Sequence, residues 1–204
     1  NTIDDKLEIM SDGSYLLTKK DGSRYFYSYF GKLIKIVDTN DRYLDFTYNE
    51  NHELVKISDT FSREIIINRN NGKISKITDP LGREYRYGYS GDRLVSFTDP
   101  EGNTRRYTYS EVGMTSTIYP DGNGWNYYYT EVDGRMVVDY QTDASGAVID
   151  FEYDPTAKRT IVTNRRGFQR TYLYNDNHLT IEEIDADYGR VYKTYDENNN
   201  LISI

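Results

Sequence analysis

The chain has 204 residues, with 33 acidic and 25 basic side chains, a formal net charge of −8 and no cysteine. The negative charge disfavours binding to nucleic acid and to anionic membrane surfaces, because phosphates would be repelled. The lack of cysteine excludes disulfides and thiolate metal sites, and no apolar run of about 18 residues could span a bilayer. The chain has 22 tyrosines, against 7 phenylalanines and 1 tryptophan. Tyrosine suits half-buried surfaces, so we expect thin layers in place of a thick apolar core.

A turn and a tyrosine recur about every 20 residues. The clearest copies are TDPLGREYRYGYS at residues 78–90 and TDPEGNTRRYTYS at residues 98–110, where a tyrosine follows the turn glycine by seven positions. Internal repetition of this kind indicates a repeat architecture. We expect about nine copies in a continuous array over residues 19–204, after a leading strand or incomplete repeat in residues 1–18, the whole being a fragment of a longer protein. The expected positions of this tyrosine, here called the anchor, are Tyr29, Tyr48, Ile67, Tyr89, Tyr109, Tyr129, Tyr153, Tyr174 and Tyr195.

Each copy is expected to form two antiparallel strands. Tyr85, Tyr87 and Tyr89 alternate with other residues, which is the period of a half-buried strand. In Asp-Pro-x-Gly the aspartate begins a type I turn, and the glycine is expected to adopt a positive φ. Two strands in about 20 residues leave no room for a crossover helix, so neighbouring strands must be antiparallel.

A second segment of each copy contains Leu-x-x-Ile-x-Asp, as in residues 33–38, 54–59 and 94–99, the last with phenylalanine for isoleucine. Residues three apart lie on opposite faces of a regular strand. Either this strand contains a bulge, or both faces of the sheet are partly covered.

The combined pattern resembles the YD repeat of the Rhs family, which includes bacterial Rhs polymorphic toxins, wall-associated proteins, the B and C components of Tc toxins, and teneurins. The resemblance implies an all-β fold in which antiparallel β-hairpin repeats form a long curved or spiralling sheet, part of a hollow shell. It also implies that the shell encloses a toxin or other cargo domain of a secreted or cell-surface bacterial protein. The implied partners are the flanking repeats and a C-terminal cargo domain of the same polypeptide. The protease motif that ends the repeats in this family does not occur here, so no catalytic residue is carried over.

The aromatic rows give a second hypothesis, a carbohydrate-binding or adhesion module. Aromatic side chains repeated across neighbouring strands can form a platform for sugar rings, although cross-strand tyrosine pairs also simply stabilise a sheet. The candidate platform residues are Trp125, Tyr127, Tyr129, Tyr107, Tyr109, Tyr87 and Tyr89. The DGNGW segment before the tryptophan indicates a locally altered turn.

The remaining chemistry is sparse, and we expect neither enzymatic activity, nor a cofactor, nor a resident metal. No phosphate-binding loop, nucleophile elbow or zinc-protease motif occurs. Both histidines, His52 and His178, fall in polar turns. The segment IEEIDADYG favours a solvated acidic edge over a calcium site, although weak calcium binding near Asp185 and Asp187 stays open. The terminal LISI, residues 201–204, is apolar and uncharged, which predicts edge-to-edge association.

Overall fold

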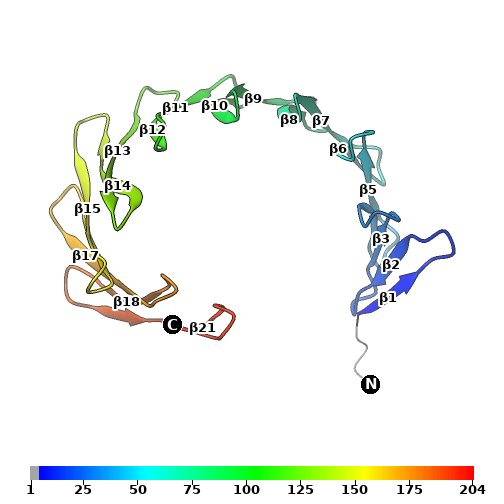
Figure 1. Ribbon diagram of the computed structural model, residues 1–204. Helices are drawn as coiled ribbons and strands as arrows, with labels where there is room; N and C mark the ends of the chain where they lie inside the picture. Colours follow the sequence, from blue (N-terminus) through cyan, green and yellow to red (C-terminus); the bar gives the residue numbers. More distant parts are fainter. Residues whose placement is uncertain (1–4) are drawn as a thin grey trace. The chain divides into compact units, whose positions relative to one another are not determined.

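The computed structural model describes residues 5–204, in which every regular element is a strand. No helix of this part of the chain could therefore cross a membrane. The strands fall into two units, Asn1–Asn103 and Thr104–Ile204. In each unit a strand pairs with the next along the chain in an antiparallel ladder of hairpins (Figure 1). The expectation of an all-β fold built from antiparallel hairpin repeats is confirmed.

The first unit contains ten strands that pair in sequence from β1 to β10. The leading strand expected within residues 1–18 falls partly on residues 1–4, which lie outside the described residues. The strands are β1 (Lys6–Ile9), β2 (Tyr15–Thr18), β3 (Arg24–Tyr27), β4 (Leu33–Val37), β5 (Tyr43–Tyr48), β6 (Leu54–Asp59), β7 (Glu64–Asn70), β8 (Lys73–Thr78), β9 (Glu84–Ser90) and β10 (Arg93–Thr98).

The second unit contains nine strands that pair in sequence from β11 to β19, and a separate hairpin of β20 and β21. The strands are β11 (Thr104–Tyr109), β12 (Met114–Ile118), β13 (Gly124–Val132), β14 (Arg135–Asp143), β15 (Val148–Asp154), β16 (Arg159–Thr163), β17 (Gln169–Tyr174), β18 (Thr180–Ile184), β19 (Arg190–Tyr192), β20 (Thr194–Tyr195) and β21 (Leu201–Ser203).

The Asp-Pro-x-Gly segments form the expected turns. The Gly82 N–H donates to the Asp79 carbonyl at 2.9 Å, and the Asp79 carboxylate accepts from the backbone N–H of Leu81 at 2.9 Å. Gly82 and Gly102 have φ values of 78° and 86°, which confirms the positive φ expected at both. Glycine takes this conformation without a steric penalty.

In several repeats the second turn begins with the residue after the anchor, which is aspartate in some copies and asparagine in others. The side chains of Asn49, Asn175 and Asp196 each accept a hydrogen bond from the backbone N–H two residues later, at 2.9–3.0 Å. Asparagine and aspartate form this side-chain turn equally well. The position therefore requires a side-chain oxygen and not a charge.

The strand that contains Leu-x-x-Ile has a β-bulge, which was one of the two alternatives left open by the sequence. Leu94 pairs with Tyr89 and Phe97 pairs with Tyr87, with a register shift between Leu94 and Ser96. Since Tyr87 and Tyr89 share a face of β9, the inserted residue places Leu94 and Phe97 on that same face. Bulges at the equivalent place occur in the hairpins β3–β4, β5–β6, β7–β8, β11–β12, β13–β14, β17–β18 and β20–β21.

Two of the expected anchor positions are wrong. The residue opposite the leucine of Leu-x-x-Ile is Tyr27 in the first copy, where Tyr29 was expected. In the third copy Arg69, and not Ile67, lies opposite Ile74. The strand β3, with four residues, is shorter than its counterparts β5, β7 and β9. The third copy has Ser62, with φ 61°, in place of the glycine from which the spacing is counted.

The two faces of the sheet differ in chemistry. The tyrosine face, defined by the anchors and by the Leu and Ile positions, contains most of the large apolar side chains. The ion-pair face, on the other side, has Lys35–Asp45 at 3.1 Å and Lys56–Glu64 at 2.9 Å. In the described part, the only buried hydrophobic residues are Val37 and Ile67, with exposed fractions of 7% and 8%, and no large side chain is fully buried. Each unit is thus a single layer without a covering second layer (Figure 1).

Candidate functional site

Four of the anchor tyrosines link their repeat to the one before it. The Tyr129 hydroxyl donates to the Met114 carbonyl at 2.8 Å, and the Tyr153 hydroxyl donates to the Val138 carbonyl at 2.8 Å. Tyr48 and Tyr195 make the same bond, also at 2.8 Å, to Leu33 and Thr180. Each acceptor is the bulge residue that faces the preceding anchor, where the ladder is interrupted. These hydroxyls are therefore structural.

The structure places the seven candidate platform residues on the tyrosine face of three strands. Tyr87 and Tyr89 lie on β9 in the first unit, and the other five lie on β11 and β13 in the second. All are half-buried except Tyr89, whose exposed fraction is 37%. The ring of Tyr129 covers Gly113, where a Cβ would lie 2.8 Å from the tyrosine hydroxyl. The sugar platform stays a prediction.

The tryptophan of the platform borders a recess of about 360 Å³. Trp125 shares this recess with Asp143 and Arg165, which form an ion pair at 3.1 Å. The altered turn expected from DGNGW is wrong, because the Gly122 N–H donates to the Tyr119 carbonyl at 3.0 Å, as the turn glycines do elsewhere. The second glycine of this segment acts in the strand instead: a Cβ on Gly124 would lie 2.0 Å from the Thr117 carbonyl oxygen. Gly124 thus permits the close approach of β12 and β13.

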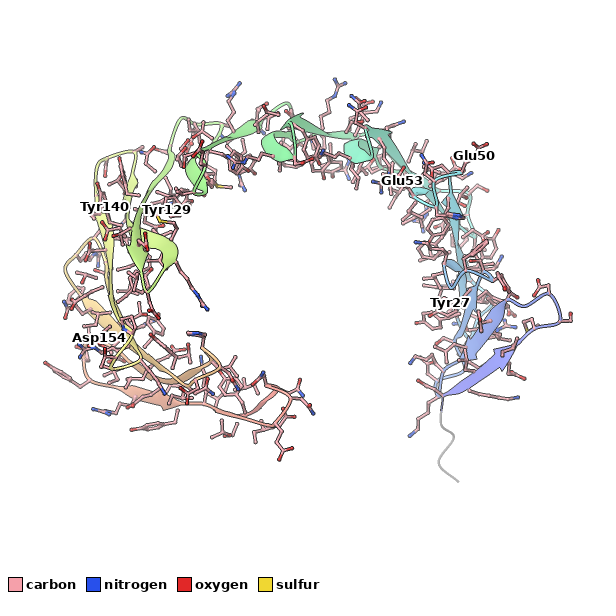
Figure 2. The ribbon with its side chains drawn as sticks, in the orientation of Figure 1. Tyr27, Glu50, Glu53, Tyr129, Tyr140 and Asp154 are labelled. Carbon is pink, nitrogen blue, oxygen red and sulfur yellow. The ribbon has the colours of Figure 1, made fainter. Side chains whose placement is uncertain are left out.

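An aromatic pair on the opposite face was missed from the sequence. Tyr128 and Tyr140 are cross-strand partners whose rings stack with centroids 4.3 Å apart and an interplanar angle of 13°. Figure 2 labels Tyr129 and Tyr140, which lie in the hairpin of β13 and β14. The signal lay in the run of three tyrosines at 127–129, because the middle residue must point away from its neighbours.

The hairpin of β13 and β14 is the longest in the described residues, with nine residues in each strand. It ends in Asp133-Gly134, with φ values of 51° and 72°. Positive φ at both positions is the type I′ turn that Asp-Gly favours, and this turn matches the twist of long hairpins. The dipeptide could have revealed the extension in the sequence.

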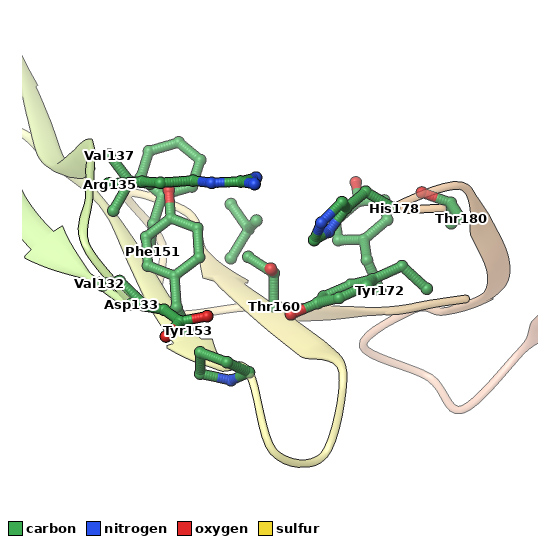
Figure 3. A pocket seen from close by; sticks show the side chains of 13 residues that line it. Val132, Asp133, Arg135, Val137, Phe151, Tyr153, Thr160, Tyr172, His178 and Thr180 are labelled. Atoms are coloured by element: carbon green, nitrogen blue, oxygen red, sulfur yellow. The ribbon is translucent and has the colours of Figure 1, made fainter. Parts of the chain in front are cut away.

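The tip of this hairpin borders a cleft of about 680 Å³ on the tyrosine face of the second unit (Figure 3). We call this cleft the groove. It opens between the hairpin tip and the strands β15 to β17, and most of its lining is aromatic or aliphatic. Its lining residues are Val132, Asp133, Arg135, Val137, Phe151, Tyr153, Pro155, Thr160, Val162, Tyr172, Tyr174, His178 and Thr180.

Several contacts fix the walls of the groove. The Tyr153 hydroxyl is held by the Val138 carbonyl, and burial, assisted by the Asp139 carboxylate, raises the pKa of its phenol. The rings of Tyr174 and His178 pack with centroids 5.6 Å apart. Arg135 extends from the hairpin tip toward the side on which His178 lies (Figure 3).

The other polar candidates have structural roles in their turns. His52 packs on Phe30 with ring centroids 5.3 Å apart and has a φ of 59°. Asp185 accepts the backbone N–H groups of Asp187 and Gly189 at 2.9 and 2.8 Å, as the turn aspartates do elsewhere. Within residues 5–204 no group of three or more His, Cys, Asp or Glu side chains could hold a metal ion. Nearby glutamates form ion pairs, Glu182 with Arg190 and Glu183 with Lys193.

A comparison with protein families matches part of the chain. The family model of the RHS repeat matches residues 90–124, which include β10, β11 and β12. Residues 90–124 are an RHS repeat. The resemblance to the Rhs family drawn from the sequence is thereby confirmed, and the hairpin and bulge of this RHS repeat recur in both units. No curated protein matches the chain.

Three solved structures illustrate the similarities of fold. TcdB2-TccC3 without its hypervariable C-terminal region has 10% identity and a TM-score of 0.46, covering 97% of this chain and 17% of that chain. The Tc holotoxin pore of Photorhabdus luminescens has 13% identity and a TM-score of 0.39, and the match covers 92% of this chain and 14% of that chain. A porin-like protein from Bacteroides uniformis has 12% identity and a TM-score of 0.43, covering 97% and 85%. With TM-scores this low, the fold assignment depends on the strand ladder itself.

Proposed function

We propose that the chain is a structural segment of a β-shell that encloses a toxin or other cargo domain. The observation that carries this proposal is the single-layer ladder of RHS hairpins, which leaves the tyrosine face without a protein layer over it. A globular domain of this size would ordinarily bury one face of such a sheet against a second layer. A wall needs no second layer, because its inner face meets an enclosed protein or lumen.

The chemistry of the two faces assigns their directions in this wall. The ion-pair face places charged partners such as Lys76–Glu84, at 2.7 Å, where bulk water solvates them. The tyrosine face combines apolar rings with hydroxyl groups, so it tolerates both a wet lumen and contact with a cargo. We therefore assign the tyrosine face to the inside. The proposed partners are flanking repeats and a cargo domain of the same polypeptide.

The absence of cysteine allows a direct test of this assignment. Gln141 lies on the tyrosine face opposite Tyr127, and Asn126 lies on the ion-pair face opposite Thr142. In the full-length protein, with its flanking repeats and cargo domain, the cysteine of Gln141→Cys should react with a small maleimide and not with a bulky polyethylene-glycol maleimide. Asn126→Cys is the matched control and should react with both. Equal reaction of the two variants with the bulky reagent would contradict enclosure.

We also propose that the protein acts outside the bacterial cytoplasm, secreted or at the cell surface, and cell fractionation tests this. The carbohydrate-binding alternative would require a free aromatic surface at the platform. Glycan-array binding that is lost in Trp125→Ala and retained in Tyr128→Ala, a tyrosine of the opposite face, would favour that alternative over the shell. A chain that binds no glycan while its inner face is protected supports the shell.

A further inference from the structure

The groove exists because one repeat departs from the common length. The anchors Tyr129 and Tyr153 are 24 residues apart, whereas Tyr109 and Tyr129 are 20 apart. The additional residues lengthen β13 and β14 beyond the bulge and place the type I′ tip at the border of the groove. Elsewhere the tyrosine face keeps the shorter hairpins. This insertion is unnecessary for the ladder, which continues through β15 and β16.

The shape and lining of the groove suit a small organic ligand. Its volume of about 680 Å³ lies within the range of about 300–1,000 Å³ common for such sites. Tyr153, Tyr172 and Tyr174 line it with aromatic rings, and Val137 and Val162 add aliphatic surface. Flat aromatic groups pack favourably against walls of this kind.

The charge at the rim indicates the sign of the ligand. Arg135 lines the groove together with one carboxylate, Asp133, but no carboxylate among residues 5–204 lies within ion-pair distance of Arg135. The neighbouring cations Lys158 and Arg159 are paired with Asp176 and Asp154. A guanidinium group recognises a carboxylate through two parallel hydrogen bonds. The chain has a net charge of −8 and repels anions in general, so an anion that binds must do so at a local cation.

We propose that the groove binds a small aromatic carboxylate, with its ring between the tyrosine walls and its anionic group on Arg135. This proposal is independent of the shell function, since the groove is formed by residues of the second unit alone. The insertion leaves the ladder unchanged, so a purely structural wall does not need it. A ligand-binding site would account for its presence.

The test uses anilinonaphthalenesulfonate, a fluorescent aromatic anion whose sulfonate stands for the carboxylate, and its uncharged analogue phenylnaphthylamine. The wild-type chain should bind the anion saturably, and Arg135→Gln should weaken that binding roughly five- to tenfold, as expected for one exposed charge-assisted contact. Binding of the uncharged analogue should be unaffected by this substitution. Arg106→Gln, which removes an exposed arginine on β11, is the matched control and should change neither titration.

A second variant tests the location without removing a wall. Thr160→Phe fills the groove from its β16 side and should abolish binding of both probes while the thermal melt stays cooperative. Unsaturable binding to the wild-type chain, or equal weakening by Arg135→Gln and Arg106→Gln, would overturn the proposal. So would a dimer in sedimentation that Thr160→Phe converts to monomer, because the groove would then belong to a second copy of the chain.

Discussion

Tyr129→Phe tests the hydrogen bond that connects one repeat to the repeat before it. The substitution keeps the ring over Gly113 and removes only the hydroxyl that donates to Met114 at 2.8 Å. A net hydrogen bond is worth about 1 kcal/mol, and leaving a partly buried carbonyl without its donor adds to the loss. We expect a decrease of about 1–2 kcal/mol in the free energy of unfolding. For a chain of this size each kcal/mol corresponds to about 2–4 °C in melting temperature.

The adjacent tyrosine provides the control for this experiment. Tyr128→Phe removes a hydroxyl from the same strand, but on the ion-pair face, where the ring stacks on Tyr140. It should leave the melting temperature within about 1 °C, as most surface substitutions do. Because repeat arrays need not unfold in two states, the melt should be accompanied by amide hydrogen exchange at Thr115 and Ser116 beside the bulge. Equal effects of the two substitutions on stability and exchange would refute the structural role of the anchor hydroxyl.

Three further predictions concern the turns. Gly82→Val should lower the free energy of unfolding by roughly 1–3 kcal/mol in denaturant titrations, because the φ of 78° at Gly82 strains any branched residue. Leu81→Ala should change it little, and equal losses in the two variants would contradict the turn assignment. Tyr188→Gly should raise stability by about 0.5–1 kcal/mol, since Tyr188 has a φ of 65° and an exposed fraction of 83%; an unchanged or lower melting temperature would count against this account. The Asn103 side chain, opposed by partial desolvation and aided by backbone donors, holds the pKa of Asp99 below its ordinary value. The stability from this group is therefore complete above the unfolded pKa of about 3.9 and is lost as the pH falls through the lower folded value, so Asp99→Asn should flatten the acid side of a melting-temperature profile.

The turns and strand faces could be predicted from the sequence because they depend on local chemistry. The type I turn at Asp79 and the alternation of Tyr85, Tyr87 and Tyr89 require only the conformational preferences of a few neighbouring residues. The same reasoning failed in the third copy, where a serine takes the place of the turn glycine. Ser62 has a φ of 61°, and counting seven residues from it reaches Arg69, the true anchor.

The bulge and the groove are harder to derive because both depend on pairing between strands. The sequence showed that Leu94 and Phe97 could not share a face of a regular strand, but not whether the strand or the packing was irregular. The pairing of β9 with β10 shows that the strand is irregular, because the register shifts after Leu94. The groove was missed because its lining comes from several strands, although the Asp133-Gly134 dipeptide was a local sign of a longer hairpin.

The bulge also explains how this architecture can acquire a site without losing its ladder. At four of the bulges the hydroxyl of the anchor tyrosine in the following repeat donates to the exposed carbonyl. This bond lies between the bulge and the next repeat, and any residues inserted in the second turn lie on the other side of the bulge. Residues added beyond the bulge extend a hairpin tip and leave the bonded register behind it unchanged, as β13 and β14 show. The second turn is consequently the place where length varies most freely, and the groove under the Asp133-Gly134 tip is a result of that freedom. Structural constancy and local specialisation therefore reside in different parts of the same repeat.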